Sequence, residues 1–387
     1  MLSQHSVIQR LLLIVFISFL SVLTPRISFA ASAVYQSAQK EFVLGNYDKV
    51  VTLLKGKTDI DSIILVSRAG HLIDDADDKP LVALLGKEPN NEKALTAMAF
   101  IEEESRHYRE AQQTLDHIFR TSHQNAQAIA VLALCKVRQG GEEAGMKILA
   151  DALKLGDKDP IVLELAEGAY DCVFDSVQTE KTCDRLIALQ PRNAHYWWLK
   201  GRFLERAGKT DKALECYSKA ISVNPRFDFA YNSRAKIYFE RKDYHKVVSD
   251  ASACIATPMC KGEVYDALNL RATANGILGK HAEAIADLKE YLRLTDSAHH
   301  PEFIKQDEAY LKMGFEYIAL GKYTEAENVL VILRKLNRRT SEVLEQEAVI
   351  QERLGHKEAA IKLYEKLIKE EGNNPSWVAA LKKLKGK

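Results

Sequence analysis

Residues 194–227 read AHYWWLKGRFLERAGKTDKALECYSKAISVNPRF, and this stretch decides the fold. Apolar residues recur at helical spacing from about Ala194 to Ala207, and again from Asp211 to about Val223. Gly208 lies between the two stretches and can adopt the left-handed conformation that ends a helix, while Pro225 blocks continuation of the second helix. The unit therefore predicts two antiparallel helices joined by a short turn.

The unit predicts its own packing as well. Large apolar residues are expected to face inward at four positions: Trp197, Leu204, Tyr217 and Ile221. Small residues at Gly201 and Ala213 let the two helix axes approach closely. One helix pair cannot bury this apolar face alone, so the pairs must stack on neighbours.

The pattern recurs with a period of 34 residues. A small residue returns on one register at Ala99, Ala133, Gly201 and Ala235. We expect ten helix pairs, with three residues inserted after 261 and eight after 298. The expected divisions are two divergent units in 31–91, five contiguous units in 92–261, a unit with a short insertion in 262–298, an inserted loop at 299–306, two units in 307–374 and a capping helix in 375–387.

The repeated unit resembles the tetratricopeptide repeat. Its motif positions read Trp197-x2-Lys200-Gly201-x2-Leu204, then Ala213-x3-Tyr217-x2-Ala220-x4-Pro225. The unit at 307–340 carries Tyr310-x2-Met313-Gly314-x2-Tyr317 at the same positions. The resemblance implies an all-α, right-handed α-solenoid with a concave groove, which this family commonly uses to bind extended peptides or partner helices.

The last residues form an amphipathic helix by the same criteria. Asn374 can cap it and Pro375 can occupy its first position. One face is apolar and the rest is lysine-rich, which favours a helix that covers the exposed edge of the last repeat. The alternative is a basic helix that binds a membrane surface or a partner.

Composition excludes two classes of protein. Apolar residues make up 47% of the chain, too many for a disordered protein. Lys and Arg number 54 against 53 Asp and Glu, and a protein built for nucleic acid would carry a marked positive excess.

Residues 1–30 have the layout of a secretory signal peptide. Leu11 to Leu23 is an uncharged run of 13 residues, too short to span a bilayer core of about 30 Å. Pro25 then interrupts any helix, and Ser28-Phe29-Ala30 places small residues at a cleavage site. We expect a mature chain that begins at Ala31, or at Val34, with an uncleaved membrane anchor as the alternative.

The six cysteines do not form a metal-binding pattern. They form neither a dense framework nor a CxxC spacing. Cys254 and Cys260 bracket a short loop and are the best candidates for a disulfide, with buried free thiols as the alternative.

No motif for catalysis, a cofactor or a metal emerges, so we expect a non-enzymatic protein without a small-molecule substrate. Gly208-Lys209-Thr210 resembles the end of a phosphate-binding loop, but Phe203 stands where that loop needs its first glycine. The repeats leave no segment of domain size for a catalytic domain.

The resemblance also implies where a partner binds. In this family the second, fifth, ninth and twelfth positions of each first helix line the groove. Carried over to the units from 194 onward, these positions select eleven residues, which are His195, Trp198, Arg202, Glu205, Phe229, Asn232, Lys236, Phe239, Asp266, Asn269 and Thr273. The candidate groove set taken from them is Trp198, Arg202, Phe229, Asn232, Lys236 and Asn269.

The expected function is therefore an exported scaffold that binds a protein or peptide, in a bacterial periplasm or outside the cell. Two alternatives remain open: a subunit or maturation factor of an envelope enzyme complex, and a self-assembling structural element.

Overall fold

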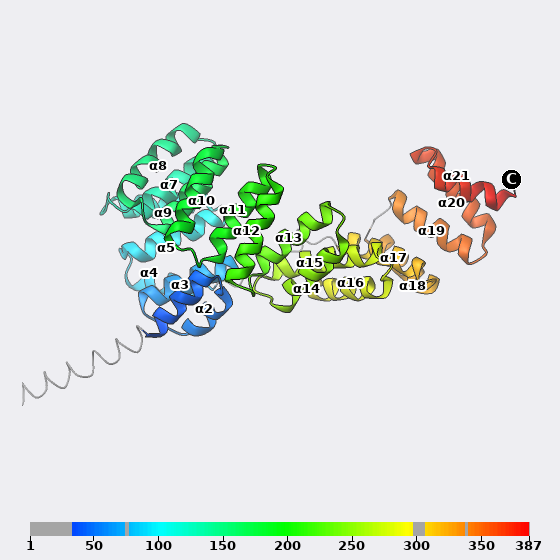
Figure 1. The fold of residues 1–387 in the computed structure, drawn as a ribbon, viewed down its shortest axis with the longest axis horizontal. Helices are drawn as coiled ribbons and strands as arrows, with labels where there is room; N and C mark the ends of the chain where they lie inside the picture. The colour runs from blue at the N-terminus through cyan, green and yellow to red at the C-terminus, as the bar shows by residue number, and fades with distance from the viewer. Residues whose placement is uncertain (1–32, 74–76, 297–305, 337–339, 387) are drawn as a thin grey trace, which may run out of the picture. The chain divides into compact units, whose positions relative to one another are not determined.

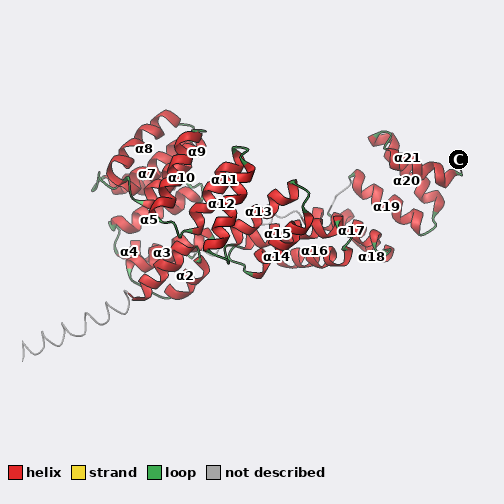
Figure 2. Cartoon of the chain, viewed as in Figure 1, coloured by secondary structure: helices red, strands yellow, loops and turns green. Residues whose placement is uncertain are grey.

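The computed structural model describes residues 33–73, 77–296, 306–336 and 340–386. Every regular element in these ranges is a helix (Figure 2), so the all-α expectation is confirmed. The predicted signal peptide and nearly all of the predicted inserted loop at 299–306 lie outside the described residues. The chain divides into two compact units, 1–227 and 228–387. We call them the N-terminal and the C-terminal unit.

The N-terminal unit consists of consecutive helix pairs (Figure 1). Residues 33–44 are helical and precede the following helices: α2 (Tyr47–Leu54), α3 (Ile60–Leu72), α4 (Lys79–Lys87), α5 (Glu92–Glu104), α6 (Tyr108–Phe119), α7 (Ala126–Arg138), α8 (Glu142–Gly156), α9 (Pro160–Cys172), α10 (Ser176–Leu189), α11 (Ala194–Arg206) and α12 (Thr210–Val223). The bounds of α11 and α12 match those predicted for residues 194–227.

The C-terminal unit continues the same alternation. Its helices are α13 (Asp228–Glu240), α14 (Tyr244–Ala256), α15 (Lys261–Ile277), α16 (His281–Asp296), α17 (Gln306–Ala319), α18 (Tyr323–Lys335), α19 (Ser341–Arg353), α20 (Lys357–Glu371) and α21 (Pro375–Lys385). The three residues inserted after 261 fall inside α15, which has 17 residues where α13 has 13.

Asparagine side chains begin several of the first helices. The Oδ1 atoms of Asn91 and Asn125 accept the backbone N–H of Ala94 and Ala128 at 3.1 and 3.0 Å. Each satisfies a donor that the first turn of a helix leaves unpaired.

Where the turn inside a pair is fully described, it contains a residue in the left-handed conformation. Gly208 has φ +71° there, as predicted, and Gly140, Gly321 and Gly355 have φ between +71° and +87°. Arg106, Phe174 and Lys242 occupy the same kind of turn with φ of 62°, 58° and 60°. Side chains at these positions strain the backbone, since L-residues disfavour this region.

Close approach within the α11–α12 pair differs in detail from the expectation. A Cβ at Gly201 would lie 2.5 Å from Cε1 of the Tyr217 ring, so Gly201 makes room for that ring rather than mainly for Ala213. Trp197 and Ile221 are only partly buried, whereas Tyr196 and Phe203 are 2% and 4% exposed. Leu204 and Tyr217 are 1% and 0% exposed, as expected. The expectation is wrong for Trp197 and Ile221, because a helix turns 100° per residue and neighbouring apolar positions compete for one face.

The last helix packs onto the preceding pair. Asn374 Oδ1 accepts the Ser376 N–H at 3.0 Å, and Pro375 takes the first position of α21. Trp377 is buried in a cluster with Tyr364 and Leu367. Its Nε1 donates to Glu345 Oε1 at 2.9 Å. The apolar face of α21 therefore covers the end of the last pair.

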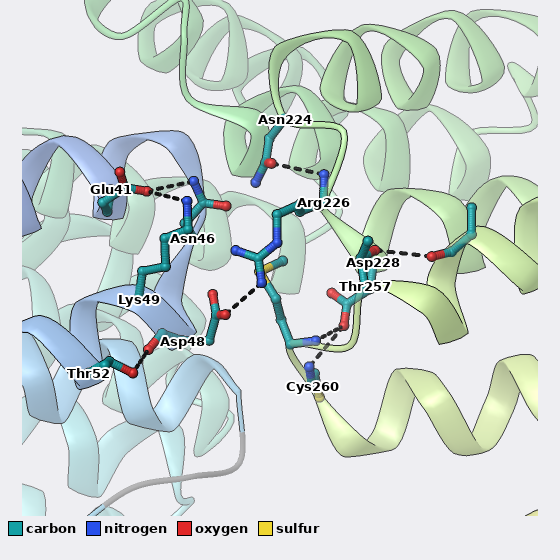
Figure 3. Close-up of polar contacts among 12 residues, drawn as sticks. Glu41, Asn46, Asp48, Lys49, Thr52, Asn224, Arg226, Asp228, Thr257 and Cys260 are labelled. Carbon is teal, nitrogen blue, oxygen red and sulfur yellow. Dashed lines mark hydrogen bonds and ion pairs between the residues drawn. The ribbon is translucent and has the colours of Figure 1, made fainter.

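The candidate disulfide between Cys254 and Cys260 is not formed. All six cysteines lie in described residues, and no disulfide joins any two of them. The Cys254 thiol lies 3.6 Å from the Glu263 carbonyl oxygen. Asp228 accepts the Met259 and Cys260 N–H groups at 2.6 and 2.9 Å (Figure 3), so hydrogen bonds rather than a bridge hold this loop.

Among the described helices, none combines the length and the apolar character that a membrane span requires.

Candidate binding groove of the N-terminal unit

The first and sixth helix pairs of the N-terminal unit meet. Arg226, just after α12, places Nη2 2.7 Å from Asp48 Oδ2 on α2 (Figure 3), although the two residues are 178 positions apart. The Tyr47 and His195 rings lie 6.4 Å apart. The unit therefore closes on itself.

Gly45 permits this closure at its tightest point. The residue has φ +83°, and a Cβ there would lie 3.0 Å from the Phe227 ring. A side chain at this position would meet the ring and strain the backbone as well.

The closed unit surrounds a cavity of about 1180 Å³, which we call the large cavity. Its lining comes from residues 35–44 and from the first helices of the next pairs, α3, α5, α7 and α9. These helices contribute side chains at recurring positions, such as Thr96 and Phe100 on α5 and Ile161 and Glu164 on α9. The concave surface of the helix array is therefore the surface of the cavity.

Amide side chains form one part of this lining. Asn125 Nδ2 donates to Glu92 Oε1 and to Thr96 Oγ1, both at 2.8 Å. Gln127 Nε2 donates to Asp159 Oδ2 at 2.7 Å. The two bonds of Asn125 use both of its N–H donors, whereas Gln127 keeps one N–H donor and its amide oxygen for another partner.

Arg68 on α3 lies at the centre of the groove. Its guanidinium carbon is 5.4 Å from the Phe42 ring centroid and 5.2 Å from that of Phe100, within the range of cation–π attraction. Its Nη2 lies 3.3 Å from Glu164 Oε2, and the Tyr196 hydroxyl donates to Glu164 Oε1 at 2.6 Å. Burial raises the pKa of Glu164, while Arg68 and the Tyr196 hydrogen bond lower it.

A second cavity of about 340 Å³, the small cavity, adjoins the first. The two share four lining residues: Phe42, Arg68, Phe100 and Glu164. The small cavity also reaches α11 at His195, Trp198 and Arg202. The Arg202 guanidinium lies 4.8 Å from the Trp198 ring centroid. Burial, with Arg202 and Arg68 nearby, lowers the pKa of His195 to about 4, so this imidazole is uncharged at neutral pH.

Glu167 on α9 is the most deeply buried acid of α9. The residue is 5% exposed and lines the small cavity. Its Oε1 atom is buried and accepts no hydrogen bond from any described residue. Burial, with a smaller contribution from Asp171, raises the pKa of Glu167 to about 7, while Arg206 and Arg202 lower it.

The groove residues expected from the sequence are divided between the two units. Trp198 and Arg202 lie together in the small cavity. Phe229, Asn232 and Lys236 lie on α13 of the C-terminal unit, and Asn269 lies on α15.

In the C-terminal unit the expected groove residues are tied to other side chains of that unit. Asn232 is buried and its Nδ2 donates to Glu263 Oε2 at 2.5 Å. Lys236 Nζ donates to Asp266 Oδ2 at 2.7 Å. Asn269 Oδ1 accepts from Lys312 Nζ at 2.8 Å. These contacts join consecutive helix pairs.

Several groove residues were not singled out from the sequence. The positional rule that selects Trp198, applied to residues 92–125 and 160–193, yields Phe100 and Glu164, which line both cavities. Phe42 and Arg68 belong to the divergent first units, where no motif residue marks the register. Glu167 lies off the rule entirely.

The described residues hold no cluster of His, Cys, Asp and Glu side chains suited to a metal ion.

Two tetratricopeptide repeat models match the chain, one at residues 194–227 and the other at residues 311–375. A tetratricopeptide-repeat-containing protein of Methanocaldococcus jannaschii is 26% identical over 193 residues, covering 48% of this chain and 32% of that protein. RNA polymerase II-associated protein 3 of Rattus norvegicus is 30% identical over 145 residues, which cover 37% of this chain and 21% of that protein. The chain spans about a third or less of the length of these relatives.

Among solved structures, that of the Cut9–Hcn1 hetero-tetramer of APC/C aligns with a TM-score of 0.47 at 13% identity, covering 90% of this chain and 69% of that chain.

Proposed function

Because the chain belongs to the tetratricopeptide repeat family, we propose that it is an exported scaffold whose N-terminal unit binds an extended segment of a partner protein. The family fold serves protein–protein interaction in general. The large cavity on the concave face carries the specific proposal, since it offers such a segment a continuous surface over four first helices and residues 35–44.

The size and chemistry of the large cavity favour a peptide over a small molecule. Its volume of about 1180 Å³ exceeds the ~300–1,000 Å³ of ordinary ligand pockets. Gln127 presents an amide with a remaining N–H donor and an oxygen acceptor, which match the C=O and N–H groups of an extended backbone, and the Asn125 oxygen can accept a further N–H. Phe42 and Phe100 supply aromatic surface of the kind that anchors partner side chains.

Export is proposed from the first thirty residues alone. An N-terminal sequence that begins at Ala31 or Val34 in the envelope fraction of the native cell supports it. Recovery of membrane-bound protein that still begins at Met1 shows an anchored protein instead.

The proposed role is binding rather than catalysis. A pull-down from the native envelope with the mature chain distinguishes this role from the alternatives. A stoichiometric foreign protein supports the scaffold, an associated enzyme indicates a subunit or maturation factor, and large homo-oligomers indicate a structural element.

Groove variants test where the partner binds. Phe100→Ala removes an aromatic ring from both cavities and leaves Arg68 with one stacking partner. We expect partner affinity to fall by about 2 kcal/mol, as for a central aromatic anchor. The matched control is Phe174→Ala, because Phe174 is 89% exposed and lies outside both cavities. A folded Phe100→Ala variant that retains full affinity moves the binding site to another surface.

A further inference from the structure

Glu167 in the small cavity has a buried carboxylate oxygen without a hydrogen-bond donor. Its Oε1 atom is buried, the residue is 5% exposed, and no described residue donates a hydrogen bond to that oxygen. A buried carboxylate without a partner costs folding free energy, so such groups require an explanation.

Arg206 and Arg202 favour the charged form of Glu167, but no arginine around the small cavity donates a hydrogen bond to its Oε1 atom, and each has another contact. The contacts are Arg138 to Glu103 at 2.7 Å, Arg206 to Asp171 at 2.6 Å, Arg68 to Glu164 at 3.3 Å, and Arg202 over the Trp198 ring at 4.8 Å. The surface next to Glu167 therefore offers a place for an added positive charge.

Glu167 lies beside free space in the small cavity, which has a volume of about 340 Å³. Gly168 follows it on α9, and a Cβ at Gly168 would meet Leu134 only at 3.6 Å, an ordinary contact. Phe42, Arg68, Phe100 and Glu164 line both cavities and so form the one layer of side chains between them. A long side chain from a segment lying in the large cavity would reach the small cavity past Arg68.

We propose that Glu167 binds the cationic side chain of a lysine or arginine from the partner segment. This proposal rests on the peptide-binding function proposed above for the same groove. An ammonium or guanidinium group supplies both the charge and the N–H donors that Oε1 lacks. The described residues hold no set of ligands for a metal ion, which favours a side-chain cation as the occupant.

Peptide pools of defined charge test the proposal. The probes are end-blocked nine-residue peptides with randomised flanks and a central Lys, Arg, Gln or Glu, measured by fluorescence anisotropy against the mature chain. We expect the Lys and Arg pools to bind at least about tenfold more tightly than the Gln pool. Glu167→Gln, which is nearly isosteric, should abolish that preference.

Two further variants keep the test independent of folding effects. Glu143→Gln makes the same charge change at an exposed position of α8 outside both cavities, and it should keep the preference. Gly168→Leu adds a side chain to the small cavity without changing charge. It should lower the affinity for the Lys and Arg pools more than the affinity for the other pools. Circular dichroism checks that each variant is folded.

The outcomes separate this assignment from the proposed function. Pools that bind the parent without preference for Lys or Arg, or an unchanged preference in folded Glu167→Gln, overturn the role of Glu167 and leave the groove standing. A parent chain that binds no pool contradicts the peptide-binding groove itself and the assignment with it.

Discussion

At the scale of the residue, two side chains lower the stability of the fold in ways that the adjacent sequence does not indicate. Phe174 is 89% exposed in a left-handed conformation, where glycine stands in six other turns of the described pairs. Glu167 is charged only at a cost, because burial raises its pKa to about 7. Both residues lie in the unit at 160–193, which departs from the repeat motif.

Phe174→Gly should stabilise the protein. A left-handed L-residue costs roughly 1–2 kcal/mol, and glycine recovers most of this while losing about 0.5–1 kcal/mol to unfolded-state entropy. We expect a net gain of about 0.5–1 kcal/mol in the free energy of unfolding, measured with urea. Phe174→Ala is the control, since it removes the ring and keeps the strain. Equal stabilities for the two variants would show that the turn is not strained.

The stability contributed by Glu167 should depend on pH. Its pKa in the folded state, about 7, lies above the ordinary value of 4.5, so the folded protein binds more protons than the unfolded chain between these values. Stability from this group is therefore fully present below pH ~4.5 and is lost as pH rises through 7.

Glu167→Gln removes that loss. The free energy of unfolding of the variant relative to the parent should rise from pH 5 to pH 8, by up to about 3 kcal/mol if the whole shift is realised. Thermal or urea unfolding across this range measures the difference, with Glu143→Gln as the control of equal charge. A difference that stays constant with pH would show that Glu167 has an ordinary pKa.

At the scale of the element, the close packing of α8 on α7 depends on one glycine. A Cβ at Gly145 of α8 would lie 2.5 Å from Val137 Cγ2 and 2.8 Å from the Ala133 carbonyl oxygen, both on α7. The carbonyl belongs to the backbone of α7 and cannot rotate away as a side chain can. The two helices must therefore separate if the glycine is replaced.

Gly145→Ala should destabilise the N-terminal unit by about 1–3 kcal/mol, as overpacking usually does. Gly168→Ala is a matched control in the neighbouring pair, because its Cβ would meet Leu134 at 3.6 Å. That control should be neutral or stabilising by about 0.5–1 kcal/mol, the ordinary gain of alanine over glycine in a helix. The reverse order of stabilities, measured by urea unfolding, would contradict the packing of α7 on α8.

At the scale of the whole molecule, closure of the N-terminal unit makes its ends depend on each other. In an open array each pair contacts its neighbours, and damage stays local. Here the contact of Arg226 with Asp48 joins the first pair to the sixth. The first and last helix pairs of the N-terminal unit therefore contact each other although they are far apart in sequence.

Arg226→Glu should loosen this closure. The substitution places two carboxylates together at residues that are each about one-third exposed, so the direct energetic cost is modest, about 1 kcal/mol. Amide hydrogen exchange should accelerate in residues 33–54 while the C-terminal unit stays unchanged.

The charge exchange Asp48→Arg with Arg226→Asp is the control and should restore protection. Unchanged exchange in residues 33–54 of Arg226→Glu would mean that the other contacts of this interface, such as Gly45 with Phe227, hold the closure without the ion pair.

The sequence by itself determined the class of fold and most of its local structure. The bounds of α11 and α12, the left-handed Gly208 and the capping of α21 by Asn374 all depend on residues within a few positions of one another. Helix propensity and turn chemistry act over that range, and the period of 34 repeats the same local pattern along the chain. Both can therefore be recognised in the sequence alone.

Only the tertiary structure decided the division after Phe227 and the groove. The period runs through 92–261 without a break, yet the chain forms separate compact units within that stretch. The sequence predicted that Trp198 and Arg202 line a groove. It did not predict the contact between Arg68 and Glu164, which line the same cavity, because these two residues are 96 positions apart. Closure depends on small rotations that add up over successive helix pairs. The total rotation is not determined by any single repeat, so the closure of the unit could not be predicted from the period.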